Sequence, residues 1–172
     1  MTDKRICLII DAGFFIGTQK ATGSIDILKL KNLIEHKFGR IERGYYITAM
    51  ETDNMRGFHS FIRSVKGPKL EVVVKNQKMK TCDNCGKQVW VEKGVDVAIS
   101  TLAIKNAQKD LYDTLVLLNG DADLLDALTY IRDDLRKEIV ICGELTNIAT
   151  EMQAIASKVL LLSDHIEEIR SN

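Results

Sequence analysis

Four aspartates occupy positions from which their side chains can act together. Asp11 directly follows the apolar run 6–10, and Asp121 and Asp123 follow a second apolar run at 115–118. Asp96 opens a helical pattern within the segment 92–97. If both runs are strands of a parallel sheet, their carboxyl ends share the edge at which such folds bind ligands, and the first turn of a helix can direct Asp96 to the same edge. We therefore expect the four carboxylates to converge.

A converging group of carboxylates has a characteristic chemistry. The negative charges repel and raise one another's pKa values unless a cation lies among them. Carboxylate oxygens together with water suit Mg²⁺ or Mn²⁺, and such an ion activates water and stabilises charge on a phosphate oxygen. The sequence therefore predicts an acidic nuclease centre with Mg²⁺ or Mn²⁺ as its cofactor. For each acid alone a structural role stays open, because Asp121 and Asp123 are typical of a first helical turn and Asp11 of an Asx turn.

The four cysteines are of two kinds. Cys7 and Cys142 lie within apolar runs, where small buried thiols are common, whereas Cys82 and Cys85 form a CxxC followed by Gly86. This spacing is typical of a zinc knuckle, in which two thiolates share one metal and the backbone amides of the turn face the sulfurs. A tight hairpin turn with reduced thiols, or a local disulfide under oxidation, is the alternative interpretation.

A tetrahedral zinc site needs four ligands, and the chain has no second CxxC. The missing ligands would be His59, His36 or the cysteines of another subunit. Two thiolates from each chain of a symmetric homodimer satisfy the count most simply. A thioredoxin-type redox pair is less favoured, because no helix follows the motif closely enough to lower a thiol pKa.

Basic side chains surround the cysteine pair. Residues 56–93 contain nine Lys or Arg against three acids, whereas residues 94–172 contain seven against fourteen, although the net charge of the whole chain is zero. A basic segment beside an acidic centre favours a polyanion such as RNA, with ordinary solvated faces as the alternative. The candidate nucleic-acid-binding residues are Lys75, Lys78, Lys80, Lys87, Trp90 and Lys93. For Trp90, an anchor of the hairpin to the core is the slightly favoured interpretation.

Other classes of protein find little support. His36, His59 and His165 adjoin no candidate nucleophile, so Ser/His/Asp catalysis has no visible basis. There is no Walker-type loop and no Gly-x-Gly-x-x-Gly, which argues against an NTPase or a dinucleotide enzyme. The apolar stretch near the N-terminus is too short for a signal peptide or a membrane span, so we expect a cytoplasmic protein without membrane association.

The elements that position these residues alternate in type. Short apolar runs predict buried strands at 5–10, 45–50, 70–74, 114–118, 138–142 and 159–162. Helical spacing, capped by Asp26 and Asn54 in the first two cases, predicts helices around 27–38, 55–65, 95–102, 124–131 and 148–155. The alternation predicts an α/β fold with a mainly parallel central sheet, in one domain over residues 1–172. The segment of about 75–91 breaks it, and we expect an inserted CxxC hairpin there.

The motifs around the aspartates resemble those of a known family. The segments 8–13, 82–85 with 92–98, and 119–124 look like the NYN domain, in the LabA-like branch of the PIN-like nuclease superfamily, and they occur in the same order over nearly the whole chain. The resemblance implies a PIN-like Rossmannoid three-layer sandwich, an acidic Mg²⁺ or Mn²⁺ centre and ribonuclease activity. It assigns the catalytic and metal-binding roles to Asp11, Asp96, Asp121 and Asp123.

Three positions depart from the family pattern. Phe14 stands where many relatives have asparagine, Leu102 where many have aspartate, and Asn119 where serine is usual. The first two changes remove an amide and a carboxylate, which would weaken binding of a second metal. The leading hypothesis is a metal-dependent (endo)ribonuclease. The alternative is a catalytically weak NYN-type domain that regulates by binding RNA or protein, and a zinc-linked homodimer is a third hypothesis.

Overall fold

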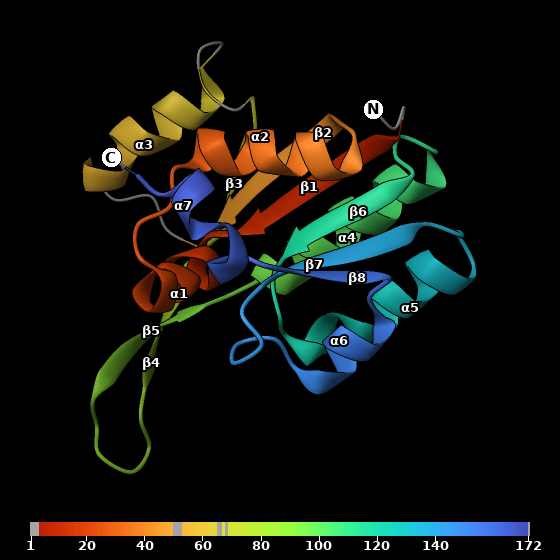
Figure 1. The fold of residues 1–172 in the computed structure, drawn as a ribbon. Helices are drawn as coiled ribbons and strands as arrows, with labels where there is room; N and C mark the ends of the chain where they lie inside the picture. Colours follow the sequence, from red (N-terminus) through yellow and green to blue (C-terminus); the bar gives the residue numbers. More distant parts are fainter. Residues whose placement is uncertain (1–3, 50–52, 65–66, 68, 172) are drawn as a thin grey trace.

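Six parallel strands form a sheet at the centre of the molecule (Figure 1). The computed structural model describes residues 4–49, 53–64, 67 and 69–171. The strands follow the order β3-β2-β1-β6-β7-β8 across the sheet. They are β1 (Arg5–Asp11), β2 (Arg40–Thr48), β3 (Glu71–Val74), β6 (Thr114–Leu118), β7 (Glu138–Gly143) and β8 (Lys158–Leu161). All six strands that the apolar runs predict are confirmed, and the fold class is α/β.

The second strand is longer than its apolar run. β2 begins at Arg40 rather than at residue 45, and its polar first half pairs in parallel with the beginning of β1, with Arg5 opposite Arg40 and Ile6 opposite Ile41. Backbone pairing rather than apolar burial defines this half, so hydrophobicity alone does not reveal it. The predicted end of the strand at residue 50 lies outside the described residues.

Both faces of the sheet are buried. Along β1, Cys7 and Ile9 belong to one hydrophobic cluster, whereas Ile6, Leu8 and Ile10 belong to the other, and each of these side chains is at most 1% exposed. The alternation follows the period of two of a pleated strand. Burying each such side chain contributes roughly 1.5–3 kcal/mol, which explains why a continuous apolar run rather than an alternating one marks this strand.

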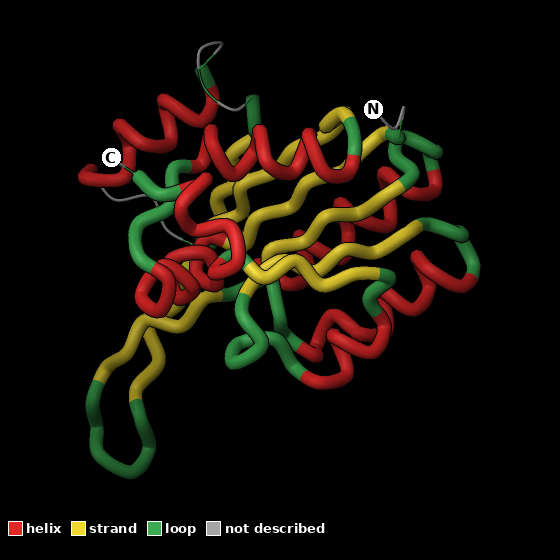
Figure 2. The backbone as a smooth tube through the Cα atoms, in the orientation of Figure 1, coloured by secondary structure: helices red, strands yellow, loops and turns green. Residues whose placement is uncertain are grey.

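Helices cover each face, as Figure 2 shows. Buried residues of α1 (Ala12–Thr22), α2 (Ile27–Phe38), α3 (Asp53–Arg63) and α7 (Ile166–Ile169) join the cluster on one side of the sheet. On the other side lie α4 (Val95–Gln108), α5 (Leu125–Asp133) and α6 (Thr150–Ile155). The three-layer arrangement that the family resemblance implies is therefore present. No described helix is long and apolar enough to cross a membrane.

The helix boundaries confirm some sequence predictions and correct others. Asp26 caps α2, because its carboxylate accepts hydrogen bonds from the backbone amides of Leu28 (2.8 Å) and Lys29 (3.1 Å). Asn54 is not a cap, since α3 already begins at Asp53, and the predicted end of that helix at residue 65 lies outside the described part of the chain. Ile148 precedes α6 but is still buried, so the fifth apolar pattern begins before its helix.

The first helix has no counterpart among the sequence predictions. α1 starts at Ala12, directly after β1, without any intervening loop. It contains Gly13 and Gly17, which are poor helix formers, and it continues the apolar run of the strand. The side chain of Asp11 supplies the missing initiation signal by capping the helix.

A separate antiparallel hairpin interrupts the alternation, as predicted. Its strands β4 (Gln77–Thr81) and β5 (Gln88–Glu92) form a two-stranded sheet of their own. In Figures 1 and 2 this hairpin extends away from the body, and its chain returns directly into α4. The insertion therefore ends at the helix that carries Asp96.

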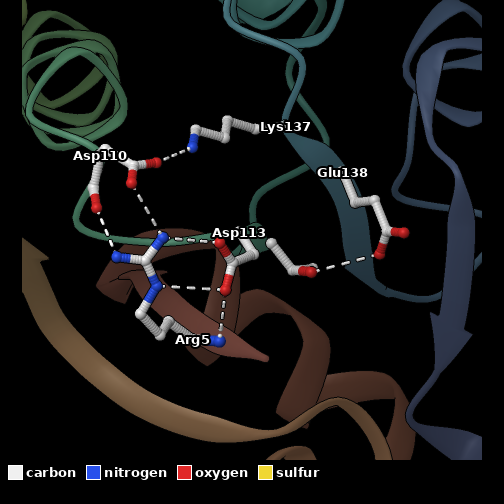
Figure 3. Close-up of polar contacts among 6 residues, drawn as sticks. Arg5, Asp110, Asp113, Lys137 and Glu138 are labelled. Atoms are coloured by element: carbon white, nitrogen blue, oxygen red, sulfur yellow. Dashed lines mark hydrogen bonds and ion pairs between the residues drawn. The ribbon is translucent and has the colours of Figure 1, made fainter. Parts of the chain in front are cut away.

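At the amino ends of the strands, an ion-pair network fixes the connection between α4 and β6 (Figure 3). The guanidinium group of Arg5 binds both carboxylate oxygens of Asp113, at 2.7 and 3.2 Å, and the carbonyl oxygen of Asp110 at 2.6 Å. Lys137 pairs with the carboxylate of Asp110. The Arg5 hydrogen bonds lower the pKa of Asp113 to about 2. This network lies at the end of the sheet opposite Asp11 and is structural.

Candidate metal centre at the carboxyl edge of the sheet

Three of the four predicted acids line one pocket. Asp11 is the last residue of β1, Asp121 follows the end of β6, and Asp96 lies in the first turn of α4. The pocket has a volume of about 320 Å³. Its lining consists of Asp11, Gly13, Phe14, Gly94, Val95, Asp96, Asn119 and Asp121. The strand order explains the convergence, because β1 and β6 are neighbours and their carboxyl ends meet at the same edge.

Asp11 is buried and held in place by its own helix. Its Oδ1 atom accepts hydrogen bonds from the backbone amides of Gly13 (2.8 Å) and Phe14 (3.2 Å), and the residue is 9% exposed. The structural role that the sequence leaves open for Asp11, an Asx turn, is therefore present, and it caps α1. Burial raises the pKa of Asp11, and the hydrogen bonds to its carboxylate oppose this rise.

Asn119 connects the two strand ends. Its amide nitrogen donates a hydrogen bond of 2.8 Å to Oδ2 of Asp11, and its oxygen accepts one of 2.6 Å from the backbone amide of Asp121. Asn119 is 2% exposed, so these bonds are shielded from water. The sequence prediction treats this residue only as a replacement for serine. Its position directly after a buried strand, beside the strand that ends in Asp11, is the signal that marks it as part of the site.

Asp121 and Asp123 have different surroundings. Oδ1 of Asp121 accepts a hydrogen bond of 3.0 Å from the backbone amide of Asp123, and this contact caps the short helix η1 (Ala122–Leu124). Both residues are exposed, but only Asp121 lines the pocket. Three acids therefore surround the pocket, and a ligand role for Asp123 stays a prediction.

The pKa of Asp96 is raised in part by the other acids. Gly94 has a φ angle of 79°, a left-handed conformation that suits glycine and starts α4 so that Asp96 lies in its first turn. Burial raises the pKa of Asp96 most, followed by the negative charges of Asp121 and Asp11, with a smaller contribution from Asp123. Asp96 thus lies in the electrostatic field of acids that belong to other elements.

The donor set suits a hydrated hard cation better than a fully enclosed one. Among the described residues, no three His, Cys, Asp or Glu side chains lie close enough together to enclose a metal ion. The hydrogen bonds of Asp11 use three of the four acceptor positions of its carboxylate. Mg²⁺ commonly keeps several waters and binds through one or two carboxylates, so acids placed around an open pocket fit that mode.

Comparison with known proteins places the chain in a family. The NYN domain model matches residues 5–163. The chain belongs to the NYN domain family. That family is part of the PIN-like nuclease superfamily, whose members typically use divalent metals.

This NYN domain also resembles a solved structure, a protein of unknown function from Vibrio parahaemolyticus. The two are 19% identical, with a TM-score of 0.74 over 97% of this chain and 96% of that one. At this identity the likeness shows a common fold. A search of curated proteins finds no match.

Two residues that depart from the family resemblance differ in their surroundings in this NYN domain. Phe14 is half-buried, lines the pocket and lies against two glycines: a Cβ atom added to Gly143 would be 2.7 Å from its ring, and one added to Gly120 would be 2.9 Å away. Leu102 packs against the core cluster formed with α5 and α6 and does not line the pocket. The apolar ring of Phe14 thus forms part of the pocket wall.

The two faces of the hairpin carry different kinds of side chain. In the ladder, Met79 pairs with Trp90, Lys78 with Val91 and Lys80 with Val89. Because successive side chains of a strand point to opposite faces, Lys78 and Lys80 lie on the face opposite Met79 and Trp90. Trp90 is 63% exposed, so the interpretation as a core anchor is not supported. Lys87 and Lys93 are exposed, and Lys75 is half-buried at the base of the hairpin.

The cysteines divide as the sequence predicts. Cys7 and Cys142 are completely buried in the sheet, whereas Cys82 and Cys85 lie in the turn of the hairpin, the first half-exposed and the second exposed. All four are free thiols. His59 is completely buried beside Tyr46, so it is not accessible to a metal at the hairpin turn.

Proposed function

We propose that this NYN domain is a metal-dependent ribonuclease that hydrolyses phosphodiester bonds at the pocket lined by Asp11, Asp96 and Asp121. The observation that carries the proposal is the pocket itself, which joins three carboxylates from separate elements at the carboxyl edge of the sheet. Their mutual repulsion makes a cation favourable there. Membership of a nuclease superfamily supports the same reaction class.

Each side chain of the pocket would have a distinct role. Asp11, Asp96 and Asp121 would surround a hydrated Mg²⁺ or Mn²⁺, one or two of them binding it directly and the rest through its waters, with Asp123 contributing charge from the rim. A bound ion of this kind supplies an activated water and stabilises charge on phosphate. Asn119 would act as a positioning residue, since it holds the Asp11 carboxylate and the Asp121 backbone in fixed relation. Hydrogen bonds already present before the substrate arrives reduce the reorganisation needed during the reaction.

The substrate proposed is RNA. The exposed lysines of the hairpin, together with Lys93 next to the pocket-lining Gly94, would attract the phosphates toward an edge that otherwise repels them. Trp90 offers an exposed ring on which a base can stack. Assignment to the LabA-like branch and a cytoplasmic location are part of this proposal and rest on the sequence motifs.

A catalytically weak RNA- or protein-binding regulator is the second candidate. Phe14 favours it, because an apolar ring lines the pocket where the family resemblance implies an amide. Under this alternative the lysines still bind RNA, but the pocket does not hydrolyse it.

The decisive experiment measures cleavage of a single-stranded RNA by purified protein with Mn²⁺. We expect EDTA to abolish cleavage and Asp121→Asn to lower its rate by about 100-fold, because the variant loses a negatively charged metal ligand while its amide oxygen can still cap η1. Asp126→Asn, an exposed acid of α5 outside the pocket, is the matched control and should retain wild-type rate. Equal cleavage by the Asp121→Asn protein would refute the assignment. Absence of cleavage by wild type, with RNA binding retained in both proteins, would establish the regulator instead.

A further inference from the structure

We propose that Cys82 and Cys85 form half of a Zn²⁺ site, completed by the same two cysteines of a second copy of this chain, so that two molecules join hairpin to hairpin. The inference does not rest on the nuclease proposal, but it assigns the ring of Trp90 to the contact between two molecules rather than to base stacking. It concerns the turn between β4 and β5, at the tip of the hairpin that extends away from the body in Figure 1.

The turn already has the backbone of a metal-binding knuckle. The amide of Gly86 donates a hydrogen bond of 2.8 Å to the carbonyl oxygen of Cys82, and the amide of Cys82 donates one of 2.8 Å to that of Lys87. Gly86 has a φ angle of 66°, in the left-handed region that favours glycine. The loop therefore closes tightly between the two cysteines and the start of β5.

The sulfurs face the inside of this turn together. The Cys82 sulfur accepts hydrogen bonds from the backbone amides of Asn84 and Cys85, and the thiol of Cys85 also contacts it. Zinc at 2.3 Å from each sulfur needs the two sulfurs roughly 4 Å apart, which side chains in contact satisfy.

The other cysteines and His59 do not complete the site. Cys7, Cys142 and His59 are all buried away from solvent in the body. Within the part of the chain that the structure describes, no three His, Cys, Asp or Glu side chains lie close enough together to enclose a metal ion. A structural zinc site has four ligands, so the turn supplies half of one, and a two-fold axis through the metal supplies the other half.

A second copy fits this hairpin in shape and charge. The hairpin projects from the body, which leaves its turn accessible to another molecule (Figure 2). Met79 and Trp90, paired across the strands and 48% and 63% exposed, form an apolar face that a second hairpin would cover. Lys78 and Lys80 lie on the opposite face, so they would not face the same two lysines of the second copy, and the positive charges would not repel across the contact. Four thiolates around Zn²⁺ carry a net charge of −2, which the exposed Lys87 next to the turn would offset.

The test combines metal analysis with the mass of the protein in solution. Wild type purified with Zn²⁺ should contain one zinc per two chains and have the mass of a dimer, and chelation should return it to monomer. Cys82→Ser and Cys85→Ser should each lose both the zinc and the dimer. Lys78→Ser, which introduces the same residue in the same hairpin outside the turn, is the matched control and should retain both.

Three outcomes would overturn the proposal: one zinc per monomer, no zinc in wild type, or a dimer whose mass is unchanged in both cysteine variants. Thiol alkylation provides a second measurement that does not depend on mutant folding. Zinc should protect Cys82 and Cys85 in the native protein, whereas chelation should expose them, and Cys7 and Cys142 should stay unmodified in both states because they are buried. Equal labelling of the turn with and without zinc would contradict the site.

Discussion

The side-chain amide of Asn119 donates a hydrogen bond of 2.8 Å to the carboxylate of Asp11 on the neighbouring strand. Through its oxygen the same amide holds the backbone of Asp121. Two acids that would repel each other are thereby kept in fixed positions by a neutral residue, and the pocket is organised before any cation or substrate binds.

Removal of that amide should damage both stability and the site. Asn119→Ala leaves a buried carboxylate oxygen and a backbone amide without partners, which costs about 1–3 kcal/mol in the free energy of unfolding. Asn119→Ser, the residue usual in the resembling family, keeps a hydroxyl and should retain more of both stability and metal affinity. Denaturant unfolding and Mn²⁺ titration measure the two effects. Equal metal affinity in all three proteins would show that Asn119 has no positioning role.

Removal of a negative charge from the pocket should stabilise the metal-free protein. Asp96 experiences the negative charges of Asp121 and Asp11, so Asp96→Asn relieves repulsion and should raise the melting temperature in EDTA. Added Mn²⁺ should stabilise wild type strongly and the variant weakly, because the variant has lost a ligand. Asp134→Asn, at an exposed position after α5, is the control and should behave as wild type. A lower melting temperature for Asp96→Asn than for wild type in EDTA would contradict the repulsion between Asp96 and the other acids.

Phe14 should make glycine necessary at position 143. A Cβ atom there would lie 2.7 Å from Phe14 Cζ, so Gly143→Ala should destabilise the protein by about 1–3 kcal/mol. In a Phe14→Ala background the same change should cost much less. Gly120→Ala is the contrasting case, because its Cβ would meet the backbone oxygen of Asn147 at 2.4 Å, and truncation of Phe14 should not rescue it. A double-mutant cycle by denaturant unfolding tests both pairs, and additive costs at position 143 would disprove the contact.

The Arg5–Asp113 ion pair should make stability depend on acid pH. The pKa of Asp113 is lowered to about 2 in the folded protein, against about 3.9 in an unfolded chain. The contribution of Asp113 to the free energy of unfolding is therefore complete above about pH 4 and is lost as the pH falls toward about 2. Because the carboxylate is 38% exposed, solvent screening limits this contribution to about 1 kcal/mol. Asp113→Asn should flatten this part of the profile of unfolding free energy against pH, and an identical slope in wild type and variant would refute it.

The basic face of the hairpin should bind RNA through its phosphates. Lys78→Gln with Lys80→Gln should weaken binding of single-stranded RNA and reduce the dependence of log K on log salt by about 0.7 for each lost phosphate contact. Lys105→Gln with Lys109→Gln, exposed at the far end of α4, is a control of equal charge change. Fluorescence anisotropy over a salt series measures the slopes. Equal slopes for the two double variants would exclude the hairpin face as the binding surface.

The amino-acid sequence alone determines the layers of this protein and the placement of its acids. Runs such as 6–10 and 115–118 must be buried on both faces, and parallel strands then bring Asp11 and Asp121 to one edge. These conclusions follow from local periodicity, so no tertiary information is needed. The family resemblance and the CxxC turn are likewise visible in the sequence.

Only the tertiary structure decides how those residues meet. The Asn119 bridge joins positions 108 residues apart, and the contact of Phe14 with Gly143 crosses from α1 to β7. The first helix is hidden from the sequence pattern, because its start depends on the Asp11 cap rather than on propensity. The separation of Trp90 from Lys78 and Lys80 depends on the pairing register, which a shift of one residue would reverse. Hydrogen bonds and packing between distant segments are set by backbone geometry, and local sequence patterns carry no information about that geometry.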